Sequence, residues 1–121
     1  MSTLATRRAE LTAAMATGGV VISDAPGRIA PPVGYIYGDG IDPRGIGRGQ
    51  VAAAFRVTLV VGSPDAPAAS AALGVLTLKA LSALRNMNGW QVGEVRPDAV
   101  RTIAGALYLS ADVTASALID L

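Results

Sequence analysis

The sequence predicts an α+β fold. It indicates a single domain, residues 1–121, in which a mixed and mainly antiparallel sheet of about five strands packs against an N-terminal helix and one long helix. Three stretches carry this prediction. Residues 51–61 and 103–119 alternate between apolar and polar side chains, as half-buried strands do. Between them, residues 64–87 repeat apolar side chains at helical spacing and end at Asn88-Gly89.

The first part of the chain predicts a helix followed by two short strands. The helix covers residues 3–16, with Thr3 as its N-cap and the pair Gly18-Gly19 as its end. Its apolar face carries Leu4, Leu11 and Met15. The strands are Val20–Ser23 and Val33–Tyr37, and the prolines before the second strand indicate an edge position in the sheet.

Residues 38–50 contain five glycines and one proline, and they separate two predicted strands. This composition predicts a long, flexible loop that is poorly ordered in the free protein, because glycine loses the most conformational freedom on folding. The loop also carries Arg44 and Arg48. Two interpretations remain open for these arginines: solvated loop charges, or contacts with a polyanion or an acidic partner surface.

The predicted long helix begins after Ser63, which is the expected N-cap, with Pro64 in the first turn. One apolar stripe is expected to face the sheet: Leu73, Leu76, Ala80, Leu84 and Met87. A second apolar face is formed by Val75, Leu78 and Leu81. A lone domain with one sheet does not need it, so we expect this face to pack on the first helix or on another subunit.

The C-terminal part predicts a weak strand over 90–96, a turn at Pro97-Asp98, and a long alternating strand over 103–119. The last strand would span about 55 Å at the usual rise per residue, which is longer than such a domain. Either Gly105 interrupts it, or its end crosses to a neighbouring subunit. The second possibility places Leu118 and Leu121 in a subunit interface.

Composition argues against most enzymatic chemistry. The chain has no histidine and no cysteine, which removes the commonest general base, thiolate nucleophiles and the usual soft metal ligands. The glycine-rich stretch leads into a strand and not into a helix, so it does not match a dinucleotide-binding fingerprint. Lys79 is expected to be a solvated surface lysine. We therefore expect no catalytic residue, no cofactor, no metal and no membrane span.

The order of motifs resembles that of the tail terminator proteins of long-tailed (siphovirus-type) bacteriophages, in the forms carried by actinobacterial phages. A helix leads into VVIS, and the proline-containing strand APPVGYIYGDG follows. Then come AAFRVTLVVGSPDAPAASAAL and the closing VRPDAVRTIAGALYLSADVTASALIDL. The resemblance covers nearly the whole chain, although its glycine-rich stretch is longer than the family requires.

This resemblance implies a structural virion protein of the tail or neck, assembled in the host cytoplasm. Such proteins form a ring, expected to be hexameric, that caps the major tail tube protein and joins it to the head-tail connector protein. Genomic DNA passes through the lumen without sequence specificity. On this basis Arg44, Ile46 and Arg48 would line the lumen or dock on the next ring, while Val75, Leu78, Leu81, Leu118 and Leu121 would lie between subunits.

Two other interpretations stay open. The first is a neck connector of the same particles, either a stopper or a tail-completion protein, because these have similar sizes and folds. The second is a small ligand-binding or enzymatic α/β domain that uses the glycine-rich loop as a lid. Size in solution separates the second from a ring-forming protein, since a lidded enzyme is expected as a monomer or dimer.

Overall fold

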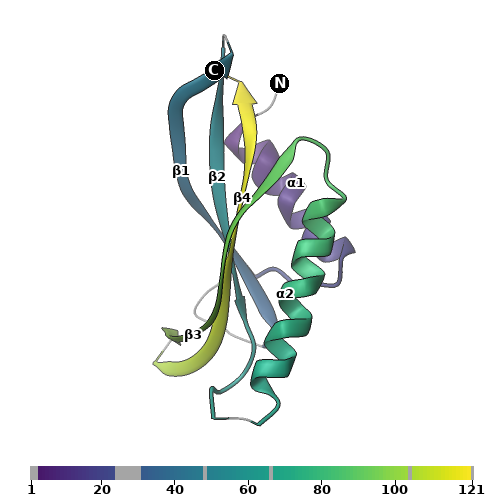
Figure 1. Ribbon diagram of the computed structural model, residues 1–121, viewed down its shortest axis with the longest axis vertical. Coiled ribbons are helices and arrows are strands. Elements are labelled where there is room, and N and C mark those ends of the chain that lie inside the picture. The colour runs from purple at the N-terminus through teal and green to yellow at the C-terminus, as the bar shows by residue number, and fades with distance from the viewer. Residues whose placement is uncertain (1–2, 24–30, 48, 66, 104, 121) are drawn as a thin grey trace.

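The computed structural model describes residues 3–23, 31–47, 49–65, 67–103 and 105–120. Its elements, in chain order, are α1 (Leu4–Thr17), β1 (Val33–Gly47), β2 (Gln50–Val60), α2 (Ala69–Arg85), β3 (Trp90–Ile103) and β4 (Ala106–Asp120). The strands form an antiparallel sheet in the order β1-β2-β4-β3. Figure 1 shows both helices on one side of this strongly twisted sheet. The predicted α+β class is confirmed.

The centre of the sheet is the antiparallel pair β2 and β4, in which Gln50 lies opposite Asp120 and Val60 opposite Ser110. The residues of these strands that face the helices are buried, as their alternation predicted: Val51, Ala53, Phe55, Val57, Leu59, Leu109, Ala111, Val113, Ala115, Ala117 and Ile119. Leu107 shares the predicted face but is 57% exposed, because it lies near the end of the hairpin.

The first helix has nearly the predicted bounds, but Leu4, which was predicted on its apolar face, is 44% exposed. Polar side chains bind the helix to the sheet. Thr3 and Thr6 form a reciprocal capping box, and Leu11 and Met15 are fully buried. Three side chains of α1 then reach three different strands, through the hydrogen bonds Arg7 Nε to the Leu118 carbonyl (2.8 Å), Arg8 Nη2 to the Ile36 carbonyl (2.6 Å) and Trp90 Nε1 to Glu10 Oε1 (2.8 Å).

The loop predicted over residues 38–50 is wrong, because this stretch forms a β-hairpin. β1 continues to Gly47, which pairs with Gln50 across a two-residue connection. The register shifts between Gly38 and Gly40, so the ladder contains an irregularity there. Gly40 has φ +123° and Gly49 has φ +79°, conformations that favour glycine. These two glycines therefore shape a hairpin, whereas composition alone indicated flexibility.

Two predicted boundaries near prolines are also wrong. α2 begins at Ala69 with Ala68 as its N-cap, so Ser63 does not cap it. A helix started at Pro64 would need a hydrogen bond from the nitrogen of Pro67, which carries no hydrogen. The turn predicted at Pro97-Asp98 lies inside β3, where the register shifts between Arg96 and Ala99. An edge strand tolerates a proline at such a bulge.

The end of β4 does not cross to a neighbour as far as Asp120. Gly105, with φ +82°, separates β3 from β4, so the predicted overlong strand is interrupted there. Ala117 pairs with Ala53 on one side and with Trp90 on the other. Residues 118–120 pair with β2 alone, since the pairing with β3 ends at Ala117. β4 therefore stays in the sheet of its own chain as far as Asp120, and the predicted crossing is wrong for these residues. Contact of their other side with a second subunit stays a prediction.

The predicted strand Val20–Ser23 is reduced to an isolated parallel bridge between Ile22 and Gly34. The amide of Ser23 donates to the Gly34 carbonyl (2.9 Å), and the Gly34 amide donates to the Val21 carbonyl (2.7 Å). The segment therefore covers part of the outer edge of β1. The edge position predicted for β1 within the sheet is confirmed.

Gly18→Ala should destabilise the fold, because a Cβ at this position would lie 2.8 Å from the Ala83 Cβ, at the contact between α1 and α2. We expect the free energy of unfolding to fall by about 1–3 kcal/mol, as overpacking does. Gly74→Ala is the matched control. Nothing lies within 4 Å of its added Cβ, and alanine in a helix should raise stability by roughly 1 kcal/mol. Urea unfolding measures the stability of both variants. Equal effects of the two substitutions would contradict a close contact between Gly18 and Ala83.

Candidate functional site

The outer face of α2 is the most exposed apolar feature of a helix in the described part of the chain. Its inner face is buried as predicted, with Met87 partly buried beside it: Leu73, Leu76, Ala80 and Leu84. On the outer face, Val75 is 56% exposed and Leu78 is 68% exposed, while Leu81 is partly buried against the core. The expectation that Val75 and Leu78 pack on the first helix is therefore wrong; burial against another subunit stays a prediction.

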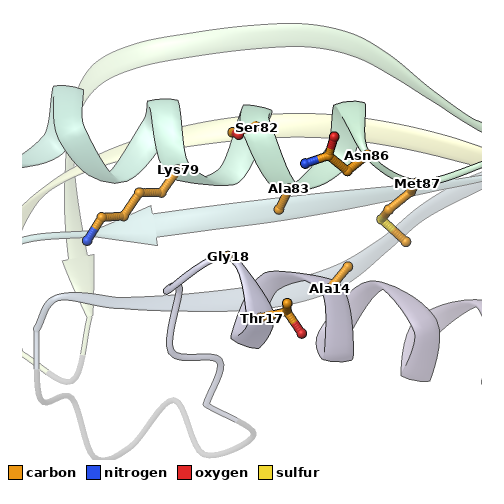
Figure 2. A pocket seen from close by; sticks show the side chains of 8 residues that line it. All are labelled: Ala14, Thr17, Gly18, Lys79, Ser82, Ala83, Asn86 and Met87. Atoms are coloured by element: carbon orange, nitrogen blue, oxygen red, sulfur yellow. The ribbon is translucent and has the colours of Figure 1, made fainter.

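The first helix contacts a different side of α2. Gly18 lies against Ala83, and Figure 2 shows the hollow between the ends of the two helices, about 380 Å³ in volume. Lys79 extends along this hollow toward the end of α1. Its ammonium group there is favourably placed beside the negative end of the helix dipole. Lys79 is exposed, as expected, and no carboxylate is among the residues that line the hollow.

A second hollow lies on the outer side of α2, where the helix faces the beginning of β3. Its volume is about 700 Å³, and we call it the α2 groove; it is lined by Leu78, Leu81, Ser82, Arg85, Asn86 and Val92. Val92 is 39% exposed, so the groove has an apolar floor that comes from two elements. Arg85 is exposed and has no ion-pair partner among the described residues. The α2 groove thus combines apolar surface with one unpaired positive charge.

The face of the sheet opposite the helices carries a polar and aromatic cluster. Asp112 accepts a hydrogen bond from Thr58 Oγ1 (2.7 Å) and forms an ion pair with Arg101 (2.6 Å). The Arg56 guanidinium lies 5.2 Å from the centre of the Tyr37 ring. At an edge of this face, Arg96 pairs with Glu94 (3.0 Å), and this hydrogen bond and charge raise the pKa of Arg96. Together, the contacts of this cluster link all four strands and stabilise the sheet.

Two buried groups on this face have no hydrogen-bond partner among the described residues: the Tyr35 hydroxyl and Arg56 Nε. The Arg56 guanidinium has the Tyr37 ring beside it, whereas Tyr35 lies among apolar side chains. The residue is 3% exposed and packs with Val33 and Val60 in a second, smaller core. Burial raises the pKa of Tyr35 above its ordinary value of 10.0, and the neighbouring Tyr37 and Tyr108 raise it further. A buried hydroxyl without a partner lowers stability, since it has lost its hydrogen bonds to water.

The arginines that the sequence singled out cannot be assigned contacts. Arg44 and Ile46 lie on the backbone of β1, but their side chains lie outside the described part of the chain, as do Arg48 and Leu121. Leu118 is half-buried on the open face of the sheet, and its carbonyl accepts from Arg7. The predicted interface residues therefore do not gather in one place: Leu118 is on β4, whereas Val75, Leu78 and Leu81 are on α2.

Sequence reasoning missed Arg85, Val92 and the Asp112 cluster. Arg85 was not among the residues that the sequence singled out, and Val92 belongs to the weak strand predicted over 90–96. Thr58 and Asp112 are 54 positions apart, and only the β2–β4 register brings them together. The alternation of β4 did place Asp112 away from the helices, which was the available signal.

Comparison with known proteins gives no match, either to a family model or to a curated protein. Within the described ranges, no group of three or more histidine, cysteine, aspartate or glutamate residues is placed to hold a metal ion. In the same ranges, neither α1 nor α2 has the length and apolarity needed to span a membrane.

Tyr35→Phe should stabilise the protein by about 1 kcal/mol, because it removes a buried hydroxyl that has no partner. It should also change the alkaline pH dependence. A tyrosine whose folded pKa is raised contributes stability below pH 10 that is lost as the pH rises through the folded value, because the unfolded chain releases its proton first. Between pH 8 and 11.5, the free energy of unfolding should fall less steeply with pH in the variant than in the wild type. Tyr37→Phe, at a ring that is 37% exposed, is the control and should change stability little. A large loss of stability in Tyr35→Phe would show that its hydroxyl is hydrogen bonded.

Proposed function

We propose that this chain is the structural subunit of a ring, and that the ring terminates a phage tail tube and joins it to the head-tail connector. The resemblance of the motif order to tail terminator proteins supplies the tail and the connector as partners. The structure supports only the self-association part of this proposal. The supporting observation is the outer face of α2, where Val75 and Leu78 are exposed and no other part of the described chain covers them.

Exposed apolar side chains on one helix face are typical of protein interfaces when they form a continuous patch. Val75 and Leu78 are one turn apart on α2, and the α2 groove extends the patch from Leu78 to Val92 of β3. Burying one leucine side chain contributes roughly 1.5–3 kcal/mol. A few such contacts, repeated between neighbouring subunits, would support stable association, and a net charge of only +1 adds little repulsion between copies.

The edges of the sheet favour association through side chains over extension of the sheet. β1 contains Pro43 and two register shifts, and the segment around Ile22 bridges part of its edge. β3 contains Pro97 and two register shifts. Bulges and prolines prevent a second strand from adding a regular ladder of hydrogen bonds. We therefore propose contact through side chains, and we place it on the outer face of α2 because Leu78 is the most exposed of the large apolar residues described.

Leu78→Asp tests the proposal, because it places a charge in the proposed interface at a side chain that is 68% exposed in the monomer. We expect the oligomer seen by light scattering to dissociate, with the monomer's unfolding midpoint nearly unchanged. Ser70→Asp, at an exposed position of α2 two turns away from Leu78, is the control and should leave the oligomer intact. Loss of the oligomer in both variants, or in neither, would contradict the proposed interface. A wild-type protein that is monomeric at all concentrations would favour the lidded-domain alternative.

Arg44→Glu with Arg48→Glu tests the proposed tail role through the two arginines that the sequence singled out. In a hexamer these residues would place roughly a dozen positive charges around one opening, enough to act locally on DNA or on an acidic ring. We expect heads and tails to remain unjoined if the charges dock the ring, and joined particles to leak DNA if they line the lumen. Electron microscopy and DNA retention measure the two steps. If heads join tails normally and the particles retain their DNA, Arg44 and Arg48 have no part in the proposed function.

A further inference from the structure

We propose that the N-terminal segment, residues 3–23, is an intramolecular cap on the outer edge of β1, and that its release lets this edge pair with the same edge of a second copy. The part of β1 concerned is residues 34–38, which we call the β1 edge. The contact is separate from the outer face of α2, so it is tested independently of the proposed ring.

The β1 edge is the regular part of an edge strand. From Val33 to Gly38 the pairs with β2 follow one another without a shift, and the first irregularity comes only after Gly38. β1 is the last strand in the order of the sheet, so its outer side has no strand of the sheet beside it. Gly34 uses its amide and its carbonyl on this outer side, for residues 21–23. Since the backbone groups of alternate residues point the same way, those of Ile36 also point outward.

The N-terminal segment occupies these outward groups. The Ser23 amide donates to the Gly34 carbonyl (2.9 Å), and the Gly34 amide donates to the Val21 carbonyl (2.7 Å). Arg8 Nη2 donates to the Ile36 carbonyl (2.6 Å). An edge strand with free backbone groups is a template for pairing with another chain, and covering the edge prevents this. The contacts of Arg8 and of residues 21–23 therefore act as an autoinhibitory cap.

The cap fits closely but is held by few buried side chains. A Cβ at Gly34 would lie 3.0 Å from Ile22 Cδ1 and 3.4 Å from Val20 Cγ1, so the glycine lets the segment approach the strand. Within α1 the buried residues are Leu11 and Met15. A helix of 14 residues is marginal in water without tertiary packing. Release of the segment therefore costs less than unfolding of the sheet.

The sequence of the β1 edge identifies a second copy as its partner. It reads GYIYG, which is the same in both directions about Ile36. In an antiparallel pair of two such edges, Gly34 of one copy lies opposite Gly38 of the other. Tyr35 lies opposite Tyr37, and the two Ile36 residues face one another and exchange both backbone hydrogen bonds. Opposed aromatic side chains stabilise such a pair, and the contact is isologous, so it gives a dimer.

The outer edge of β3 competes as the partner, because residues 99–103 pair with β4 without a shift. These residues read AVRTI, which has no symmetry about its centre. A contact between β1 and β3 would also be heterologous and would not link two copies through one position of β1. The sequence symmetry therefore favours β1 with β1, and the β3 edge becomes an outcome of the test.

The test uses the absence of natural cysteine in the chain. Tyr37→Cys, at a side chain that is 37% exposed, is placed in the wild type and in an uncapped variant, Arg8→Ala with Ser23→Pro. Proline removes the amide hydrogen that the Gly34 carbonyl accepts. In the symmetric pair the two cysteines would lie about 8 Å apart, within reach of a short bismaleimide. We expect the yield of linked dimer to rise about tenfold in the uncapped variant.

Three controls make the result specific. Ser23→Ala keeps the backbone amide, and Lys79→Ala removes one positive charge away from the edge; both should behave as the wild type. Ile41→Cys lies past the first register shift, more than about 30 Å from its counterpart in the proposed pair, and should link little. No rise in the uncapped variant, or equal linking at positions 37 and 41, would overturn the proposal. Linking of Tyr37→Cys to Thr102→Cys in its place would assign the contact to β3.

Hydrogen exchange tests the release of the cap in the unmodified chain, without any variant that has to fold. The Gly34 amide donates to the cap, whereas the Val57 amide belongs to the central pair of strands. We expect the protection factor of Gly34 to be about tenfold or more below that of Val57, because the cap opens while the sheet stays paired. Equal protection of the two amides would show that the segment leaves only on global unfolding, and would overturn the proposal.

This inference and the proposed ring fail separately. Leu78→Asp, introduced into the uncapped variant, should leave the link at position 37 unchanged. A link at position 37 in a protein that forms no ring rejects only the proposed function. A ring whose uncapped variant gives no such link rejects only the β1 contact.

Discussion

The structure depends on the pairing of β2 with β4 in the middle of the sheet. These strands come from different halves of the chain, and their register fixes which side chains face the helices. On one face, the register forms a continuous apolar surface on which α1 and α2 pack. On the other face, it brings Thr58 beside Asp112 and leaves room for Arg101 to reach the same carboxylate. A shift by one residue would exchange the two faces and place charges beneath the helices.

The helix α2 has two apolar faces, and only the inner face is buried by the rest of the chain described here. Its inner stripe covers the sheet with small and branched residues, and Ala80 and Ala83 let the helix lie close to its neighbours. Its outer side keeps aliphatic residues where an isolated domain would gain from polar ones. The sheet edges, interrupted by bulges and prolines, do not offer an alternative site for regular strand addition. Irregular edges of this kind reduce the risk of indefinite sheet growth, and in the proposed ring they would direct association to side chains.

Much of the fold could be predicted, because alternation and helical spacing are local signals. The buried faces of 51–61 and of the last strand follow from the alternation. The cap at Thr3 and the end of α1 follow from another local signal, the residue types at the ends of the helix. The errors lie where one residue type has two physical uses. Glycine in 38–50 supplies positive φ and bulges, although its abundance indicated a loop. Pro97 sits in an edge strand, although it indicated a turn. The α2 groove was only half predicted, since Leu78 and Val92 become neighbours through the packing of α2 against β3.

The anchoring of α1 has a consequence for the order of events during synthesis. This helix is made before the sheet, but its polar contacts are with Ile36, Trp90 and Leu118, and the last of these partners is 111 positions from Arg7. A helix of 14 residues is marginal in water without tertiary packing. It therefore has no lasting place until β4 has left the ribosome and paired with β2. The earliest segment of the domain to emerge is thus among the last to become fixed, and until then the apolar side chains of Leu11 and Met15 are open to chaperones.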